Sequence, residues 1–187
     1  MKELRAAPNQ LTLLRLCMVP FLVIAILEGN YKTGFLLFLF AGLTDGLDGL
    51  LARLLHQRTV LGQYLDPVAD KLLLSTLFLV LNHQGLISRR VTVLVFGRDL
   101  GILVVAAILY ASMGIRDFRP SIYGKANTLV QIIALITVLL SQFYGARPVL
   151  AVRTFSLDAT VVLTVVSGFQ YAWRVTRRLT VPVAVRP

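Results

Sequence analysis

Six long apolar segments constrain the fold of this chain more than any other feature of its sequence. They cover approximately residues 10–28, 33–55, 64–83, 91–113, 122–143 and 149–173. Each segment is long enough, or nearly so, to cross a hydrocarbon core of about 30 Å as a helix. Helices satisfy their own backbone hydrogen bonds in lipid, and the segments lack the alternation typical of barrel strands. The sequence therefore predicts an all-α, polytopic membrane protein with six transmembrane helices.

The composition supports a membrane location and a single domain. Of the 187 residues, 57% are hydrophobic, which is more apolar surface than a soluble domain of this size can bury. No repeat, linker or low-complexity stretch divides the chain, so we expect one domain over residues 1–187. The first apolar segment lacks a small-residue cleavage site near Glu28, which favours a retained helix over a signal peptide. The one cysteine, Cys17, allows no internal disulfide and no cysteine metal site.

The distribution of the basic residues bears on partners and on topology. The formal net charge of +10 would suit nucleic acid, but the basic residues form short clusters between apolar runs. Such clusters are typical of a cytoplasmic membrane surface, where lipids and many substrates are anionic, so we expect no nucleic-acid partner. Basic residues are roughly twice as frequent at the segment ends that include both termini. Both termini are therefore predicted to lie in the cytoplasm.

Four of the nine acidic residues lie within or beside the apolar segments: Asp45, Asp48, Asp66 and Asp70. On a helix, residues 45, 48, 49 and 52 share one face, and residues 66 and 70 lie about one turn apart. Pro67 disfavours helical geometry at the residue before it. Asp66 is therefore either inside a helix or its N-cap, with Pro67 at the first helical position.

Carboxylates in a bilayer need compensation, because an aspartate at the centre costs about 2.5–3.5 kcal/mol on insertion scales. Two divalent cations would balance four carboxylates, and all-oxygen ligands favour Mg²⁺ first and Mn²⁺ second. Two metal ions about 3.5–4 Å apart are a recurring clamp for phosphoryl displacement. Alternatively, the carboxylates form interfacial ion pairs with Arg53, Arg58 and Lys71, or line the pathway of an ion-coupled transporter.

The acidic cluster belongs to a longer pattern, D-x2-D-G-x2-A-R-x8-G-x3-D-x3-D. Its fixed positions are Asp45, Asp48, Gly49, Ala52, Arg53, Gly62, Asp66 and Asp70. This pattern resembles the signature of the CDP-alcohol phosphatidyltransferases. Six apolar segments, with the motif at the second and third, resemble that family throughout. The resemblance implies a homodimer of six-helix subunits, each with a polar cavity open to the cytoplasm.

The resemblance also assigns roles to the signature residues. The four aspartates would hold two metal ions on the pyrophosphate of CDP-diacylglycerol, and Asp70 would also be the general base for the acceptor hydroxyl. Gly49 would let the nucleotide approach the backbone. Arg53 would contact the cytidine diphosphate moiety, as would Thr59 by its position in the family.

The N-terminal stretch, residues 8–15, reads P-N-x-L-T-x-x-R and resembles the start of the family. It would place Asn9 and Thr12 near the nucleotide. The alternative for Asn9 is a helix cap.

The acceptor alcohol depends on positions outside the signature. The stretch from Ser121 to Lys125 resembles the S-x-x-G-K of phosphatidylglycerophosphate synthases, in which serine, lysine and an arginine bind the acceptor's phosphate. Arg98, an arginine in an apolar segment, is one candidate arginine, and Arg116 and Arg119 are nearby candidates. The alternative for Arg98 is an internal ion pair with a carboxylate. A hydroxyl, a lysine and an arginine at a helix N-terminus form a sound anion site. The resemblance therefore favours glycerol 3-phosphate as acceptor, with phosphatidylglycerophosphate and CMP as products of phospholipid biosynthesis.

One departure keeps a second acceptor open. Phosphatidylglycerophosphate synthases usually have Arg-Glu where this chain has Arg98-Asp99. Arg-Asp, with the Lys-x-Asn-Thr of residues 125–128, resembles mitochondrial-type cardiolipin synthases, which use phosphatidylglycerol. We expect the plasma membrane of a prokaryote, with the active site facing the cytoplasm, or the mitochondrial inner membrane of a eukaryote.

Overall fold

The computed structural model describes residues 7–54, 60–113 and 122–180, and within these ranges it leaves out some side chains, including those of residues 47–54 and 60–65. The described residues form six helices and no strand, so the predicted all-α fold is confirmed. In chain order the helices are α1 (Ala7–Leu27), α2 (Tyr31–Leu54), α3 (Val60–His83), α4 (Arg89–Met113), α5 (Ile122–Leu140) and α6 (Arg147–Thr180).

The helices coincide closely with the six predicted segments, except that α6 continues well beyond residue 173 to Thr180. The last turns of α6 carry Trp173, Arg174 and Arg177, and the Arg177 guanidinium carbon lies 5.2 Å from the centre of the Trp173 ring. Arginine is a good helix former, so the helix persists where the apolar pattern stops. The length of an apolar run therefore predicts a span but not where its helix ends.

Glycines end α1 and α3 in the same way. Gly29 and Gly85 have φ values of 76° and 73°, a conformation that glycine adopts without steric cost. In each turn the residue after the glycine donates its N–H to the carbonyl five residues back, as Asn30 does to Ala25 at 2.8 Å. This is a Schellman motif, which satisfies carbonyls that the helix end leaves without partners.

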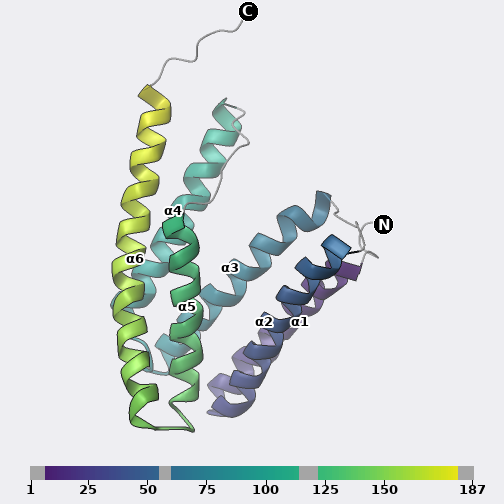
Figure 1. Ribbon diagram of the computed structural model, residues 1–187, viewed down its shortest axis with the longest axis vertical. Helices are drawn as coiled ribbons and strands as arrows, with labels where there is room; N and C mark the ends of the chain where they lie inside the picture. Colours follow the sequence, from purple (N-terminus) through teal and green to yellow (C-terminus); the bar gives the residue numbers. More distant parts are fainter. Residues whose placement is uncertain (1–6, 55–59, 114–121, 181–187) are drawn as a thin grey trace, which may run out of the picture.

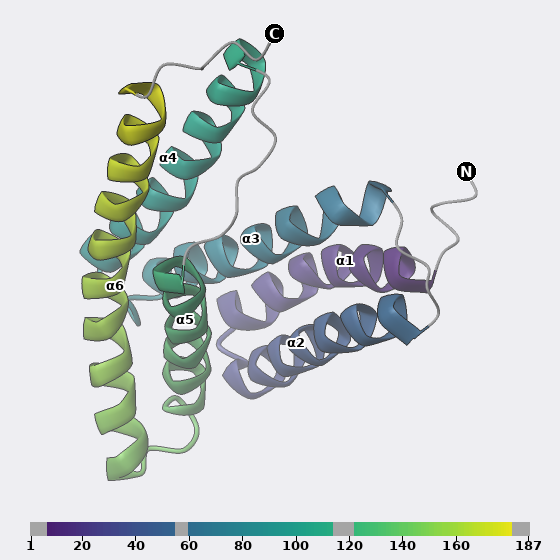
Figure 2. The ribbon, with the colours of Figure 1, turned by 45° about the horizontal axis from the view of Figure 1, so that its top comes forward.

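The helices form two groups. In the first group, α1 lies between α2 and α3 (Figure 2) and packs extensively on both. Among the described residues, α2 and α3 share few contacts of their own. In the second group, α5 and α6 form a closely packed antiparallel pair, and α4 lies along α6 (Figure 1). The two groups diverge toward the end of the molecule at which α1 begins and α6 ends.

The apolar core is centred on α3, and its members there are Leu73, Leu74, Leu77, Phe78 and Leu81. Buried side chains of α1, α2, α4 and α5 pack against them. The core therefore joins the two groups of helices and leaves the diverging ends to carry polar residues.

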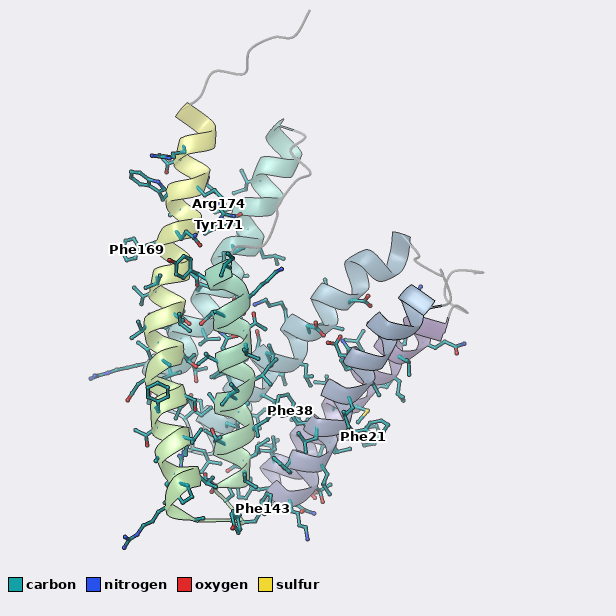
Figure 3. The ribbon with its side chains drawn as sticks, viewed as in Figure 1. Phe21, Phe38, Phe143, Phe169, Tyr171 and Arg174 are labelled. Carbon is teal, nitrogen blue, oxygen red and sulfur yellow. The ribbon has the colours of Figure 1, made fainter. Side chains whose placement is uncertain are left out.

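Several features agree with a membrane protein. Within the described ranges, three helices are long and apolar enough to cross a membrane: Asn9–Leu27, Ile122–Leu140 and Arg147–Arg177. Large apolar side chains cover the outer surface. Phe21 on α1 is 65% exposed and Phe169 on α6 is 75% exposed, and they point away from the molecule on opposite sides (Figure 3). An apolar exterior of this kind is costly in water and favourable in lipid.

Candidate active site

The two halves of the aspartate signature lie on neighbouring parts of α2 and α3. Asp45 and Asp48 are on α2, and Asp66 and Asp70 are on α3. Because α3 begins at Val60 and stays helical through Pro67, Asp66 lies inside the helix, and the N-cap alternative is wrong. A proline inside a helix removes one backbone donor, but packing against neighbouring helices makes this tolerable in a bundle.

A buried polar face of α1 meets three of these carboxylates. Thr12 Oγ1 donates a hydrogen bond of 2.7 Å to Asp66 Oδ1. One turn later, Arg15 Nη2 lies 2.8 Å from Asp45 Oδ1, and Arg15 Nη1 lies 2.5 Å from Asp70 Oδ1. A single guanidinium group therefore joins the two halves of the signature, and the carboxylates of Asp45 and Asp70 lie close together.

Burial divides this cluster into an inner and an outer part. The side chain of Arg15 has no exposed surface, whereas those of Asp45 and Asp70 are 45% and 44% exposed. Arg15 thus lies behind the two carboxylates and leaves their outer faces open. Counting only these three described side chains, one positive charge between two carboxylates leaves a net negative charge facing outward, which attracts cations.

A cavity of about 340 Å³ lies beside the cluster, between α2, α3 and α5. Arg15, Asp45 and Asp70 line its polar end, and apolar side chains, including Leu74 and Ile132, line the rest. A cavity with a charged end and apolar walls suits an amphipathic ligand.

The predicted nucleotide-binding residues are described to different extents. Asn9 is buried on α1, three residues before Thr12. Gly49 and Arg53 belong to α2, as does Asp48, but the structure does not describe the side chains of this part of α2. Thr59 lies outside the described residues.

The two predicted acceptor-binding residues that the structure describes lie on different helices and differ in burial. Arg98 on α4 is 11% exposed and donates to Asp99 Oδ1 at 2.6 Å and to Ser167 Oγ at 3.1 Å. Lys125 is exposed in the first turn of α5. Arg119 and Ser121 lie outside the described residues, so the acceptor site stays a prediction.

Comparison with known proteins identifies the family. A sequence model of CDP-alcohol phosphatidyltransferase matches residues 5–167, which include α1 and both halves of the aspartate signature. The chain belongs to the CDP-alcohol phosphatidyltransferase family. The resemblance inferred from the signature is therefore confirmed.

The names of relatives within this family bear on the choice of acceptor. The CDP-diacylglycerol--glycerol-3-phosphate 3-phosphatidyltransferase of Aquifex aeolicus is 36% identical over 171 residues, which cover 88% of this chain and 92% of the relative. The protein of the same name from Bacillus subtilis is 29% identical over 179 residues, with the same coverage of 88% and 92%. Human cardiolipin synthase (CMP-forming) is 32% identical over 156 residues, which cover 74% of this chain and 51% of the human protein.

Sequence reasoning assigned no role to Arg15, although the residue closes the N-terminal pattern of the family. The available signal was an ionisable residue inside the first apolar segment, which is a functional candidate by default in a membrane protein. Sequence reasoning considered Lys71 only as an alternative ion-pair partner of the signature aspartates. Its Nζ lies 2.6 Å from Asp99 Oδ2 instead, so an ion pair links the residue after Asp70 to α4.

The chemistry of the cluster fits the divalent cation on which this family in general depends. Carboxylate oxygens are the ligands that Mg²⁺ prefers, and those of Asp45 and Asp70 line the cavity with their outer faces open. Among the described side chains, no three His, Cys, Asp or Glu residues form a cluster able to hold a metal. Asp48, the remaining predicted ligand on α2, lies outside that description.

Proposed function

We propose that this chain transfers a phosphatidyl group from CDP-diacylglycerol to glycerol 3-phosphate, releasing CMP and forming phosphatidylglycerophosphate. The observation that carries the proposal is the contact of Arg15 with both Asp45 and Asp70 at the charged end of an amphipathic cavity. The donor is itself amphipathic, with a diphosphate and two acyl chains. Two relatives named for this reaction match across most of their own length.

The reaction replaces one phosphorus–oxygen bond with another. The acceptor hydroxyl oxygen attacks the phosphorus that bears the diacylglycerol, and the bond from that phosphorus to the oxygen of CMP breaks. We assign Asp70 as the base that takes the hydroxyl proton, since its carboxylate lines the cavity and is 44% exposed. CMP leaves with the electron pair of the broken bond.

We assign the remaining signature residues to binding the donor. Asp45, Asp48, Asp66 and Asp70 would hold two Mg²⁺ ions, or Mn²⁺ in their place, which supply electrostatic stabilisation to the phosphate oxygens. Gly49, Arg53 and Thr59 would contact the cytidine diphosphate moiety. Asn9 and Thr12 would lie near the nucleotide on α1. The hydrogen bond from Thr12 to Asp66 orients the Asp66 carboxylate toward α1.

For the acceptor phosphate we propose Arg98, Arg119, Ser121 and Lys125. Lys125 is exposed at the start of α5, where the positive end of the helix dipole favours an anion. Arg98 is already paired with Asp99. To bind the acceptor phosphate, the Arg98 guanidinium group would have to contact the phosphate and Asp99 at the same time.

We also propose six membrane spans, a catalytic end at the cytoplasmic face and a homodimer, in a prokaryotic plasma membrane or a mitochondrial inner membrane. The starts of α1, α3 and α5 and the ends of α2, α4 and α6 lie toward one end of the molecule, which is the basic end of the sequence. Cys17 is the one cysteine, so single-cysteine variants of a Cys17→Ser chain can map the topology. Labelling of Glu28→Cys from outside intact cells is the expected result, and labelling only after lysis would contradict this orientation.

Cardiolipin synthesis from phosphatidylglycerol is the second candidate. It is favoured by the Arg98-Asp99 pair and by the 32% identity with human cardiolipin synthase. Both candidates use the same donor, metal ligands and base, so only the acceptor separates them.

An acceptor panel tests the proposal. Purified protein in detergent micelles with Mg²⁺ and CDP-diacylglycerol should release CMP with glycerol 3-phosphate and not with phosphatidylglycerol. Release with phosphatidylglycerol alone would establish the second candidate. Release with neither would overturn the phosphatidyl transfer, and ion movement across reconstituted vesicles would then identify a transporter.

A further inference from the structure

We propose that Arg15 is a positioning residue that holds the two halves of the aspartate signature in register before metal and substrate bind. The proposal rests on the proposed function, because those halves form its active site. It assigns to α1 a task beyond contacting the nucleotide.

The packing of the helices creates the need for such a residue. The signature carboxylates are split between α2 and α3, and these helices share few contacts of their own among the described residues. Instead, α1 lies between them (Figure 2) and packs on both. The contacts that set the register between Asp45 and Asp70 therefore run mainly through α1, with α5, which also packs on α2 and α3, as a smaller bridge.

The geometry of Arg15 meets this need. Its Nη2 and Nη1 atoms lie 2.8 Å from Asp45 Oδ1 and 2.5 Å from Asp70 Oδ1, so one planar group contacts both helices at once. The guanidinium group has a rigid fork of donors, which fixes the direction as well as the distance of its partners. A lysine, with a compact ammonium group, cannot impose the same geometry.

Burial makes the arrangement persistent. The Arg15 side chain has no exposed surface, and a buried charge that loses its partners is strongly unfavourable. The two carboxylates repel each other and are each nearly half exposed, so they would separate without the cation behind them. One turn earlier, Thr12 holds Asp66 through a 2.7 Å bond. One face of α1 thus orders carboxylates from both α2 and α3.

Two substitutions at Arg15 separate the effect of its charge from that of its forked geometry, and a substitution elsewhere is a matched control. Arg15→Met removes the charge and the fork, and Arg15→Lys keeps the charge alone. Arg153→Met is the control, because Arg153 on α6 also joins separate elements. Its Nη2 donates to the carbonyl of Leu86 at 2.8 Å, in the turn between α3 and α4.

The first readout is hydrogen–deuterium exchange of the metal-free protein and does not depend on turnover. In Arg15→Met, amide protection should fall at least tenfold around both Asp45 and Asp70, with α5 and α6 unchanged and protection regained on adding Mg²⁺. Arg15→Lys should show a smaller loss, and Arg153→Met should lose protection only near Leu86. Protection unchanged in either signature segment of Arg15→Met, or lost along the whole chain, would overturn the proposal.

The second readout is steady-state kinetics with saturating Mg²⁺. The kcat of Arg15→Met should fall by about ten- to a hundredfold, as for residues that orient metal ligands, with KM for CDP-diacylglycerol little changed. Arg15→Lys should recover part of kcat, and Arg153→Met should keep it. A rise in KM with an unchanged kcat would make Arg15 a substrate-binding residue and contradict positioning. If the unaltered chain releases no CMP, the proposed function fails, and the exchange experiment still decides the role of Arg15.

Discussion

Arg15 Nη1 lies 2.5 Å from Asp70 Oδ1, so a fully buried cation holds the carboxylate that we assign as the general base. Asparagine has the same shape as aspartate and also carries an Oδ1 atom that can accept this hydrogen bond. The charge of Asp70 can therefore be removed while an oxygen still accepts from Arg15, which separates chemistry from folding at this position.

Asp70→Asn should abolish most of the turnover and leave the fold intact. General-base catalysis is worth about 10²–10⁴-fold, and an amide cannot take the hydroxyl proton. CMP release should fall by a factor in that range. The thermal midpoint and gel-filtration profile should stay close to those of the unaltered protein, because Arg15 keeps Asp45 as a charge partner. Glu28→Gln is the control, since Glu28 is an exposed carboxylate between α1 and α2. Equal loss in both variants, or normal turnover in Asp70→Asn, would exclude Asp70 as the base.

Removal of divalent cations should abolish CMP release reversibly. The Asp45 and Asp70 carboxylates leave a net negative charge at the cavity, and the proposed chemistry needs cations to balance the diphosphate. Dialysis against EDTA should reduce activity to background, and Mg²⁺ or Mn²⁺ should restore it. Full activity in buffer shown by elemental analysis to be free of divalent metal would contradict the assignment of the aspartates as ligands.

The helices and the acidic cluster could be predicted from the sequence, whereas the contacts that organise the cluster could not. Apolar runs specify helices because backbone hydrogen bonds in a helix are local. The bond from Thr12 to Asp66 joins residues 54 positions apart, and its existence depends on how α1 is rotated against α3. A local rule was also misleading at Pro67. The preference of the residue before a proline allowed α3 to begin at Asp66, whereas the packed helix begins at Val60.

Asp99→Asn should destabilise the protein much more than Lys71→Met. Asp99 is 6% exposed and accepts from Arg98, which is 11% exposed. Loss of the Asp99 charge leaves this buried guanidinium with no charge partner among the described residues, at about 3–5 kcal/mol. Lys71 is 40% exposed, and loss of its bond to Asp99 should cost only about 0–1 kcal/mol. Thermal unfolding in detergent measures the difference, and Asp99→Glu, which keeps the charge, is the control. Similar midpoints for Asp99→Asn and Lys71→Met would contradict the burial argument.

Gly34→Ala should loosen the packing of α2 on α1. A Cβ atom at residue 34 would lie 2.9 Å from Ile26 Cγ1, and Ile26 is completely buried and branched at Cβ, so it cannot easily turn away. Overpacking of this kind costs about 1–3 kcal/mol. Gly101→Ala is the control, because nothing lies within 4 Å of the added carbon and alanine favours a helix. Equal thermal midpoints for the two variants would show that α1 and α2 tolerate a wider separation.

Gln131→Leu should leave stability unchanged or raise it. Gln131 is completely buried on α5, and neither polar atom of its amide has a hydrogen-bond partner among the described residues. A buried polar group without a partner costs about 1–3 kcal/mol, and leucine has a similar volume without that cost. Thr164→Val is the comparison, because Thr164 Oγ1 donates to Asn127 Oδ1 at 3.1 Å in the same helix pair. That substitution should lower stability by about 0.6 kcal/mol, the average for polar contacts between membrane helices. A large loss of thermal stability in Gln131→Leu would contradict the conclusion that its buried amide lacks hydrogen-bond partners among the described residues.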